Sequence, residues 1–265
     1  MQAVRFKTPF TCYQYIAIKE ERMMNKVNNQ ESKEIPLGEI VEDANPSQVP
    51  AKKIYSGEFV TLHPVDPESD VDELFLNSHG GDSNKRIWTY MPYGPFSQKN
   101  EMLDWLRGCK ASSNMIFFTV RSKELNQRVG MMSILNIIPQ MKTLELGNIW
   151  YSPVVHFTKV NTEVVYLMLT EAFDVLNYRR VEWKCDTLNA RSRTAALRLG
   201  FSFEGIFRQH FIIKNRNRDT AWFAMIDKDW HHIKTNMIQW LYSKESNISL
   251  STLNKKLLHS TCKEI

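Results

Sequence analysis

The sequence predicts an α+β fold in which a mostly antiparallel, twisted sheet of mixed type carries helices on its faces. Strand-like runs alternate along the chain with segments whose apolar residues recur every three or four positions. Residues 115–120 and 128–137 form an antiparallel meander with the run 144–151. That run breaks at Pro153, and a helical pattern begins shortly after the break, so one domain accommodates the whole series.

The remaining elements are expected in a simple order around this centre. Asp66 and Ser97 have side chains suited to capping a helix, and each precedes an apolar pattern with helical spacing. The expected elements are a strand (58–65), two helices (66–76 and 97–107), the three meander strands, a helix (160–176), a strand (181–186), a helix (190–199), a hairpin (204–225) and a last helix (227–242).

Composition and charge exclude several classes of protein. The chain has 265 residues, of which 43% are hydrophobic, so it can bury a substantial core. No apolar run approaches the length of a membrane-spanning helix, and no membrane association is expected. The formal net charge of +5 is spread along the chain, and the densest basic cluster, 214–218, is short. Proteins that bind nucleic acid concentrate their charge, so no nucleic-acid partner is expected.

The four cysteines, Cys12, Cys109, Cys185 and Cys262, lie far apart and form no C-x-x-C pair. The sequence therefore predicts neither a metal site nor a disulfide framework, which fits a reducing compartment. We expect a cytoplasmic protein. The early basic residues leave mitochondrial targeting as an alternative, although Glu20 and Glu21 and the low Arg and Ser content are atypical of transit peptides.

Both ends of the chain are expected to lie outside the folded domain. Residues 25–50 are rich in Asn, Glu, Ser and Gln and include two prolines near their end, a composition typical of a linker. We therefore expect residues 1–50 to be a poorly ordered N-terminal extension and linker, residues 51–243 to be the domain, and residues 244–265 to be a polar, disordered tail.

The break between residues 144–151 and the following helix is the centre of the prediction. A strand that ends at a proline and leads into a helix leaves the first main-chain N–H groups of the helix pointing into the break. Such groups form a ready site for an anion. Joints of this kind also occur without any ligand, so the pattern alone leaves both interpretations open.

The motifs that follow the break resemble the GNAT superfamily of acetyl-CoA-dependent N-acetyltransferases. They are Ser152-Pro153 with Thr162-Glu163, the strand 181–186, the helix that starts at Asn189-Ala190-Arg191-Ser192 and ends at Gly200, and Asn217-Arg218-Asp219. The similarity is dense from 145 to 230 and extends over residues 55–240. It is greatest to the branch of the ribosomal-protein N-terminal acetyltransferases RimJ and RimL. The resemblance implies the acyl-CoA N-acyltransferase fold and acetyl-CoA as co-substrate.

The resemblance also assigns a phosphate-binding loop. In the superfamily this loop reads Gln or Arg, two residues, Gly, one residue, then Gly or Ala, whereas this chain has His156, Lys159 and Asn161 at those positions. Main-chain N–H groups can still hold a diphosphate, because every residue there supplies one. Lys159 is expected either to contact the diphosphate or to be solvated, and His156 to lie at the cofactor's edge. The implied cofactor-binding residues are Trp150, Tyr151, His156, Phe157, Thr158, Lys159, Val160 and Asn161.

A second cofactor contact is implied at Asn189 and Ser192, which in the family hydrogen-bond to the pantetheine arm and nearby oxygens of CoA. Asn189 is also a typical N-cap for the helix that follows it, and the two roles are compatible.

Residues 87–96 are dense in aromatic side chains around two prolines. One interpretation is a surface loop whose rings cover the core, and the other is a wall of the substrate site. The pattern W-x-Y-x-x-x-G-P-F is typical of the resembled branch. The resemblance therefore favours a substrate role for Trp88, Tyr90 and Tyr93.

Direct acetyl transfer requires a neutral amine beside the thioester, a donor for the oxyanion and a proton for the thiolate. The tyrosine that supplies this proton in many relatives is replaced by Ala196. Glu145 is the best candidate for the base, directly or through water, although it could simply pair with a basic neighbour. Tyr151 and His210 are further candidates for proton transfer, and the sequence does not rank them.

We therefore expect an acetyl-CoA-dependent N-acetyltransferase that acts on a primary amine in a ternary complex, because no cysteine has an obvious histidine partner for an acyl-enzyme. The acceptor is a protein N-terminus or a small-molecule amine. The alternative is a CoA-binding module of the same fold without transfer activity, which Ala196 and the irregular phosphate loop would suit. Both a monomer and a homodimer remain open.

Overall fold

The computed structural model describes residues 35–243 and 248–261. The chain divides into two compact units, residues 1–43 and 44–265. The possible targeting segment and most of the predicted extension, residues 1–34, lie outside the described residues, as do residues 244–247 and 262–265 of the predicted tail. The architecture below is that of the second unit.

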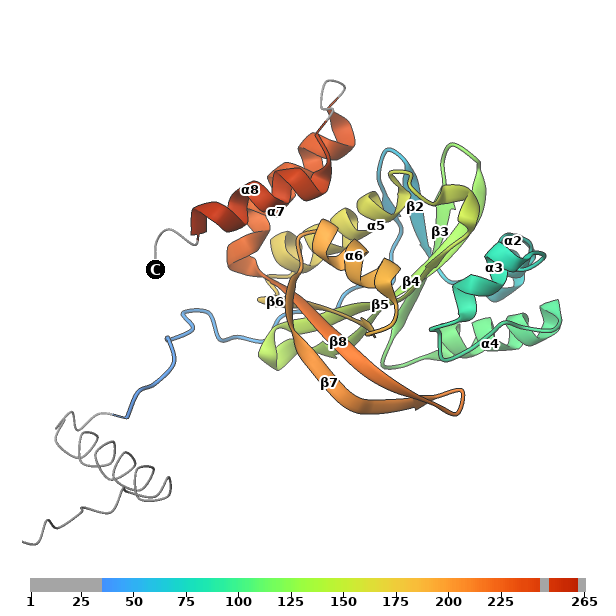
Figure 1. Cartoon of the computed structure of the whole chain (residues 1–265), viewed down its shortest axis with the longest axis horizontal. Coiled ribbons are helices and arrows are strands. Elements are labelled where there is room, and N and C mark those ends of the chain that lie inside the picture. Colours follow the sequence, from blue (N-terminus) through green and yellow to red (C-terminus); the bar gives the residue numbers. More distant parts are fainter. Residues whose placement is uncertain (1–34, 244–247, 262–265) are drawn as a thin grey trace, which may run out of the picture. The chain divides into compact units, whose positions relative to one another are not determined.

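The second unit is built on an eight-stranded sheet with the strand order β1-β2-β3-β4-β5-β6-β8-β7 (Figure 1). All neighbouring strands are antiparallel except β5 and β6, which are parallel. The predicted fold class is therefore confirmed. The strands are β1 (Tyr55–Ser56), β2 (Val60–Pro64), β3 (Ile116–Ser122), β4 (Gln127–Ile138), β5 (Thr143–Tyr151), β6 (Arg180–Asp186), β7 (Ser202–Ile213) and β8 (Arg216–Ile226).

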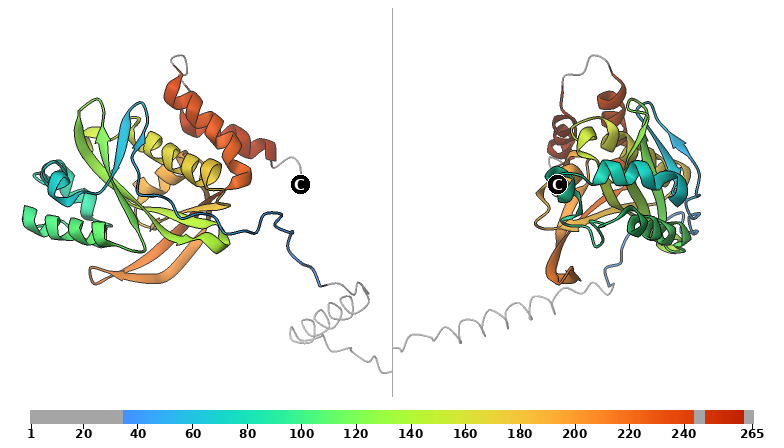
Figure 2. Two further views of the ribbon diagram at one scale, coloured as in Figure 1. Left: turned by 180° about the vertical axis from the view of Figure 1, so that it is seen from behind. Right: turned by 90° about the vertical axis from the view of Figure 1, so that its right-hand side faces the viewer.

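The helices form two groups, each with its own apolar cluster against the sheet (Figure 2). The larger cluster lies under α5, α6 and α7, and the smaller one lies under α2, α4 and the aromatic loop. The helices are α2 (Pro67–Ser78), α3 (Asp82–Lys85), α4 (Lys99–Ala111), α5 (Val160–Leu169), α6 (Ala190–Arg198), α7 (Asp227–Tyr242) and α8 (Leu250–Thr261). A π-helix, Thr170–Val175, continues α5.

The structure differs from the sequence prediction at several short elements. The two-residue strand β1 and the four-residue helix α3 were not predicted, because elements of this length show no periodicity. Ser97 does not cap α4, whose N-cap residue is Gln98. The main-chain N–H of Ser97 instead donates to the Glu101 carboxylate (2.9 Å), so an acidic residue in the first turn binds the chain entering the helix.

The folded unit begins before residue 51. The main-chain N–H of Ser47 donates to the Pro139 carbonyl (3.1 Å), and its hydroxyl donates to the Asn177 carbonyl (3.2 Å). The Tyr178 hydroxyl donates to the Gln48 carbonyl (3.1 Å). These bonds join residues 47–48 to the β4–β5 connection and to the segment before β6, so the last residues of the predicted linker belong to the domain.

The folded unit also extends beyond Ser243, where the sequence predicted a disordered tail. Leu250 and Leu253 of α8 are buried, and the side-chain amide of Asn254 donates to the Arg198 carbonyl at the end of α6 (2.9 Å). Leucines at positions 250, 253, 257 and 258 have the spacing of one helical face, which the prediction of a disordered tail left out, and the contacts with α6 and α7 show that the helix docks.

Glu163, in the first turn of α5, fixes this helix to the start of the sheet. Its fully buried carboxylate accepts the main-chain N–H groups of Glu58 (2.7 Å), Phe59 (2.7 Å) and Val60 (2.8 Å), and the Tyr242 hydroxyl of α7 (2.8 Å). Four donors compensate the desolvation of the buried carboxylate. The position of the α5 N-terminus, and hence of the break after β5, depends on this residue.

We predict that Glu163→Gln lowers the free energy of unfolding by about 3 kcal/mol, because an amide nitrogen cannot accept the main-chain N–H groups and leaves buried donors unpaired. Urea unfolding followed by circular dichroism measures this difference. Glu58→Gln is the matched control, since the Glu58 side chain is exposed and its loss should change stability by no more than about 0.5 kcal/mol. Equal stability of the two variants would refute the anchoring role.

Candidate active site

The sheet opens between its two parallel strands. β5 and β6 pair only through Thr143–Arg180, Leu144–Val181 and Glu145–Glu182, although β5 continues to Tyr151 and β6 to Asp186. Beyond Glu145, the main-chain groups of β5 and β6 that face each other are not paired with each other. Unpaired polar groups along a strand edge are suited to a ligand that itself carries amides.

The break after β5 provides free main-chain donors at the upper end of this opening. The Ser152 N–H donates to the Val129 carbonyl (2.7 Å), and a 3₁₀ turn, Pro153–Val155, leads toward α5. Within the described residues, no acceptor is found for the main-chain N–H groups of Phe157, Lys159, Asn161 and Thr162. This is the arrangement that binds anions at helix N-termini.

The side chains of Lys159 and His156 in this loop have partners within the protein, unlike the free main-chain N–H groups. The Lys159 ammonium donates to the Leu241 carbonyl of α7 and lies 4.6 Å from the ring centre of Phe59. Its side chain is therefore held by α7, and its main-chain N–H remains available. His156 Nε2 lies 3.3 Å from the Tyr151 carbonyl oxygen, and burial lowers the pKa of its ring.

Phe157 adopts a left-handed backbone conformation, with φ of 63°, and its side chain is fully exposed. A side chain other than glycine is strained in this conformation by about 1–2 kcal/mol. No packing in the described part of the chain offsets this strain. The superfamily's two glycine positions fall instead on Lys159, which has a φ of −73°, and on Asn161 in α5, so the left-handed residue of this loop is not at a glycine position.

Asn189 and Ser192 begin α6 at the opposite side of the opening. The Asn189 side-chain oxygen accepts the Ser192 N–H (3.1 Å), which confirms the predicted cap. The Ser192 hydroxyl accepts the indole N–H of Trp183 (2.9 Å). The Asn189 NH₂ group is left for other partners, whereas the Ser192 hydroxyl also hydrogen-bonds to the Cys185 side chain.

Tyr151 and Trp150, both predicted cofactor residues, are enclosed. The Tyr151 hydroxyl is buried without a hydrogen-bond partner in the described residues, and burial raises its pKa while nearby Arg198 opposes the shift. Trp150 packs with Trp88 at a ring distance of 5.2 Å, in the core beneath the aromatic loop. Ala196, at the position of the usual tyrosine, is fully buried.

Glu145 lies at the lower end of the opening, in a buried ionic cluster. Its Oε2 accepts the Asn136 amide (2.6 Å) and the Lys184 ammonium (2.8 Å), and Lys184 also pairs with Glu182 (2.8 Å). Glu145 therefore pairs with a basic neighbour, Lys184, which was the second interpretation of this residue from the sequence. Oε1 has no partner within the described residues, and it lies 3.6 Å from the place where a side chain on Gly147 would begin. One carboxylate oxygen is therefore available to an amine.

A β-bulge interrupts β5 immediately above Glu145. The pairing Met131–Trp150 is followed by Ser133–Gly147, so β5 carries one extra residue there, and Asn148 has a φ of 52°. A bulge leaves main-chain groups unpaired. Such a group beside the opening is a candidate donor to an oxyanion.

The aromatic loop is tied to this bulge and to α6. The Tyr93 hydroxyl donates to the Asn148 side-chain oxygen (3.2 Å), and the Tyr90 hydroxyl donates to the Leu188 carbonyl before α6 (3.0 Å). Trp88 is only 1% exposed. Of the three predicted substrate residues, Tyr90 and Tyr93 border the opening, whereas Trp88 supports them from the core.

The β7–β8 hairpin closes the same side. Lys214 at its tip donates to the carbonyls of Trp88 (2.8 Å) and Gly94 (2.5 Å). A bulge between Phe207 and Phe211 places His210 beside Trp222. Burial, together with the charges of Arg218 and Lys184, lowers the pKa of His210, and Glu145 opposes this shift.

Several residues of this site were not identified from the sequence, notably Asn136, Asn148 and Lys184. Lys184 could have been found, because it lies two residues after Glu182 in a strand and must share its face. Asn136 and Asn148 both have positive φ values in bulged strands, which alternation alone does not show.

The described part of the chain contains neither a candidate metal site nor a candidate membrane-spanning helix. Across the described ranges, no cluster of three or more His, Cys, Asp or Glu residues is arranged to hold a metal ion. No helix within those ranges combines the length and apolar character needed to cross a membrane.

The opening, the donor-rich helix start and the bulge define a protein of the acyl-CoA N-acyltransferase type. Residues 60–202 match the family model described as acetyltransferase (GNAT) domain. The chain belongs to this family of acetyltransferases, and the predicted enzyme class is confirmed. No match is found among the curated proteins.

Solved structures agree with this assignment. A GCN5-related N-acetyltransferase from Brucella melitensis is 34% identical, with a TM-score of 0.77, and the match covers 80% of this chain and 98% of that one. A GNAT-family acetyltransferase from Chromobacterium violaceum is also 34% identical, with a TM-score of 0.69 and coverage of 76% and 100%. The microcin C7 self-immunity acetyltransferase MccE, in complex with acetyl-CoA and AMP, shares the fold at 19% identity, with a TM-score of 0.57 and coverage of 64% and 93%.

We predict that Phe157→Gly changes the free energy of unfolding by less than about 0.5 kcal/mol, because glycine relieves the left-handed strain. Val154→Gly is the matched control, since Val154 is also exposed but has no positive φ. The control should lose about 1 kcal/mol through added flexibility of the unfolded chain. Thermal and urea unfolding of both variants tests this, and an equal loss would show that Phe157 is not strained.

Proposed function

We propose that this protein transfers the acetyl group of acetyl-CoA directly to a primary amine in a ternary complex. The observation that carries the proposal is the opening between β5 and β6, which has free main-chain N–H groups at one end and a carboxylate with an open oxygen, Glu145, at the other. The two reactants would meet between these ends.

The donor would be held mainly by the main chain. A diphosphate would accept the N–H groups at Phe157, Lys159 and Asn161, and the pantetheine amides would pair with the free edge of β5 beyond Glu145. The residues present fit this role, because main-chain donors do not depend on the missing glycines. Asn189 would add a hydrogen bond from its free NH₂ group.

The reaction forms one C–N bond and breaks one C–S bond. The amine nitrogen attacks the thioester carbonyl carbon, an N–H group of the β5 bulge near Asn148 stabilises the oxyanion, and the thiolate leaves. Glu145 Oε1 would accept the proton of the amine, directly or through water. Burial raises the pKa of the Tyr151 hydroxyl and makes it a weak acid for this step, so we propose that the thiolate takes its proton from water.

An acyl-enzyme is not part of this proposal. Cys109 and Cys185 are both buried and free, and burial raises the pKa of Cys109 to about 12 and that of Cys185 above its usual value. Such thiols are poor nucleophiles. Two unpaired buried thiols also favour a reducing, cytoplasmic setting.

The RimJ/RimL-like pattern supports a protein N-terminus as acceptor, and the family equally supports a small amine. A fold neighbour at 18% identity modifies the N-terminal serine of ribosomal protein L7/L12. Thermal-shift titration with acetyl-CoA, followed by thiol release with a panel of amines and peptides, tests the proposal. Binding of acetyl-CoA without release of thiol would favour a CoA-binding module without transfer activity. The loss of transfer would then be explained in part by Ala196, which stands where the usual acid is found.

Asn189 offers a test of donor binding. We predict that Asn189→Ala weakens acetyl-CoA binding about tenfold, through loss of one hydrogen bond and of the α6 cap. Asn189→Ser keeps a capping oxygen but not the NH₂ donor, so it should retain stability and still lose affinity. Calorimetric titration with acetyl-CoA and a melting curve separate the two effects. Full affinity in Asn189→Ser would remove this contact.

Glu145 offers a test of amine activation. We predict that Glu145→Gln lowers kcat about 100-fold or more, the usual effect of losing a general base, while the Kd for acetyl-CoA changes little. Glu182→Gln is the matched control, because Glu182 also pairs with Lys184 and lies opposite Glu145 in the β5–β6 pairing. Steady-state kinetics of both variants are compared. A similar kcat in Glu145→Gln and the wild type would exclude this role.

A further inference from the structure

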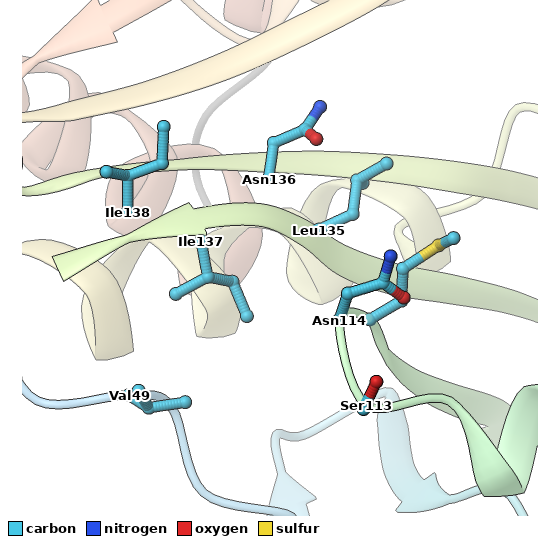
Figure 3. A pocket seen from close by; sticks show the side chains of 8 residues that line it. Val49, Ser113, Asn114, Leu135, Asn136, Ile137 and Ile138 are labelled. Carbon is cyan, nitrogen blue, oxygen red and sulfur yellow. The ribbon is translucent and has the colours of Figure 1, made fainter.

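A pocket lies beside the start of β3, where β4 continues with β5 but without β3 as a neighbour. The last β3–β4 pair is Ile116–Ile134, so residues 135–138 of β4 have a free edge on that side. Val49, residues 113–115 and residues 135–138 enclose a volume of about 410 Å³ there (Figure 3). This volume falls within the range of small-molecule sites.

The pocket lining is uncharged. Its side chains are aliphatic or thioether groups apart from Ser113, Asn114 and Asn136, and none of them ionises near neutral pH. Figure 3 shows Ile137 pointing to one side of β4 and Asn136 to the other, so the cavity reaches both sides of the free edge. A charged group in such a lining would lose its hydration without gaining a counter-charge.

Three contacts join this pocket to the proposed reaction centre. Asn136 donates to Glu145 (2.6 Å), and Met115 Sδ lies 3.8 Å from the Asn148 side-chain nitrogen at the bulge. Leu135 Cδ2 lies 2.9 Å from the position that a Gly147 Cβ would occupy, and the free Glu145 Oε1 lies 3.6 Å from that position. The Leu135 side chain therefore covers Gly147, between the pocket and the carboxylate, and a group can reach Glu145 Oε1 from the pocket only where Leu135 turns aside.

The segment before the predicted domain contributes to the lining. Val49 follows Ser47 and Gln48, which are bonded to Pro139 and Tyr178. One wall of the pocket is thus supplied from outside the region that matches the family, residues 60–202.

We propose that this pocket holds the non-reacting part of the acceptor, so that the acceptor is a primary amine on an uncharged, largely apolar body. The amine lies against Glu145 Oε1 with the Leu135 side chain turned away from Gly147, and the body extends past Leu135 toward Val49. The inference rests on the proposed acetyl transfer and specifies its acceptor class.

The experiment compares three amines in the wild-type enzyme: 2-phenylethylamine, 1,4-diaminobutane and 4-aminobutanoate. We expect kcat/KM for phenylethylamine to exceed both others at least about tenfold, because the second charge must be desolvated. An equal or reversed preference, with acetyl-CoA still bound and thiol still released, overturns the acceptor class alone. Absence of acetyl-CoA binding would instead overturn the proposed function.

Two variants test the location. Val49→Asp and Ile138→Asp place a carboxylate in the pocket and should raise KM for phenylethylamine about tenfold, the equivalent of one apolar contact, with unchanged Kd for acetyl-CoA. Both positions are exposed enough for folding to survive, at 60% and 47%. Val175→Asp, at 56% exposure and outside the pocket, is the matched control. Equal KM values in all three variants overturn the assignment.

A binding measurement gives a readout independent of turnover. In protein labelled with [methyl-¹³C]methionine, phenylethylamine should shift the Met115 methyl resonance and leave that of Met225, a buried core residue outside the pocket, unchanged. The Val49→Asp substitution should abolish the shift. An unperturbed Met115 resonance at saturating amine overturns the proposal.

Discussion

The parting of β5 and β6 is the constraint on which the rest of the site depends. A sheet normally satisfies the main-chain groups of every internal strand, yet here two neighbouring strands separate after Glu145. The separation is held from both ends, because Glu163 anchors α5 to the β1–β2 turn and Asn189 starts α6 directly after β6. In the proposed function, a ligand with amides and an anion would complete the hydrogen bonding that the protein leaves open.

The two ends of this opening present different kinds of group to a ligand. At the α5 end the donors are main-chain N–H groups, which tolerate changes of side chain such as Phe157 and Asn161. At the other end Lys184 pairs with both Glu145 and Glu182, Arg180 also pairs with Glu182, and Asn136 fixes the orientation of Glu145. The open oxygen of Glu145 can accept a hydrogen bond from an amine, whereas the adjoining uncharged pocket disfavours any second charge.

Much of the fold could be predicted because its long elements carry clear periodicity. The order of strands and helices, the meander and the break at Pro153 follow from apolar spacing alone. The docking of α8 follows a leucine spacing that the predicted tail left out, whereas the contact of Lys159 with α7 arises from tertiary packing and leaves no pattern in the sequence. Glu145 was identified from the sequence, but its partner Asn136 depends on a bulge of the β4–β5 pair, and a second bulge places Asn148 beside the opening.

This division explains why the resemblance to the family specifies the donor more firmly than the acceptor. The proposed donor site is built from main-chain groups, so it does not depend on the side chains of the glycine pattern. The proposed acceptor site is built from side chains, one of which, Val49, lies outside residues 60–202. The aromatic loop joins the two, since Tyr90 bonds to the α6 side and Tyr93 to the β5 bulge. Acceptor choice can therefore vary within this fold while donor binding stays constant.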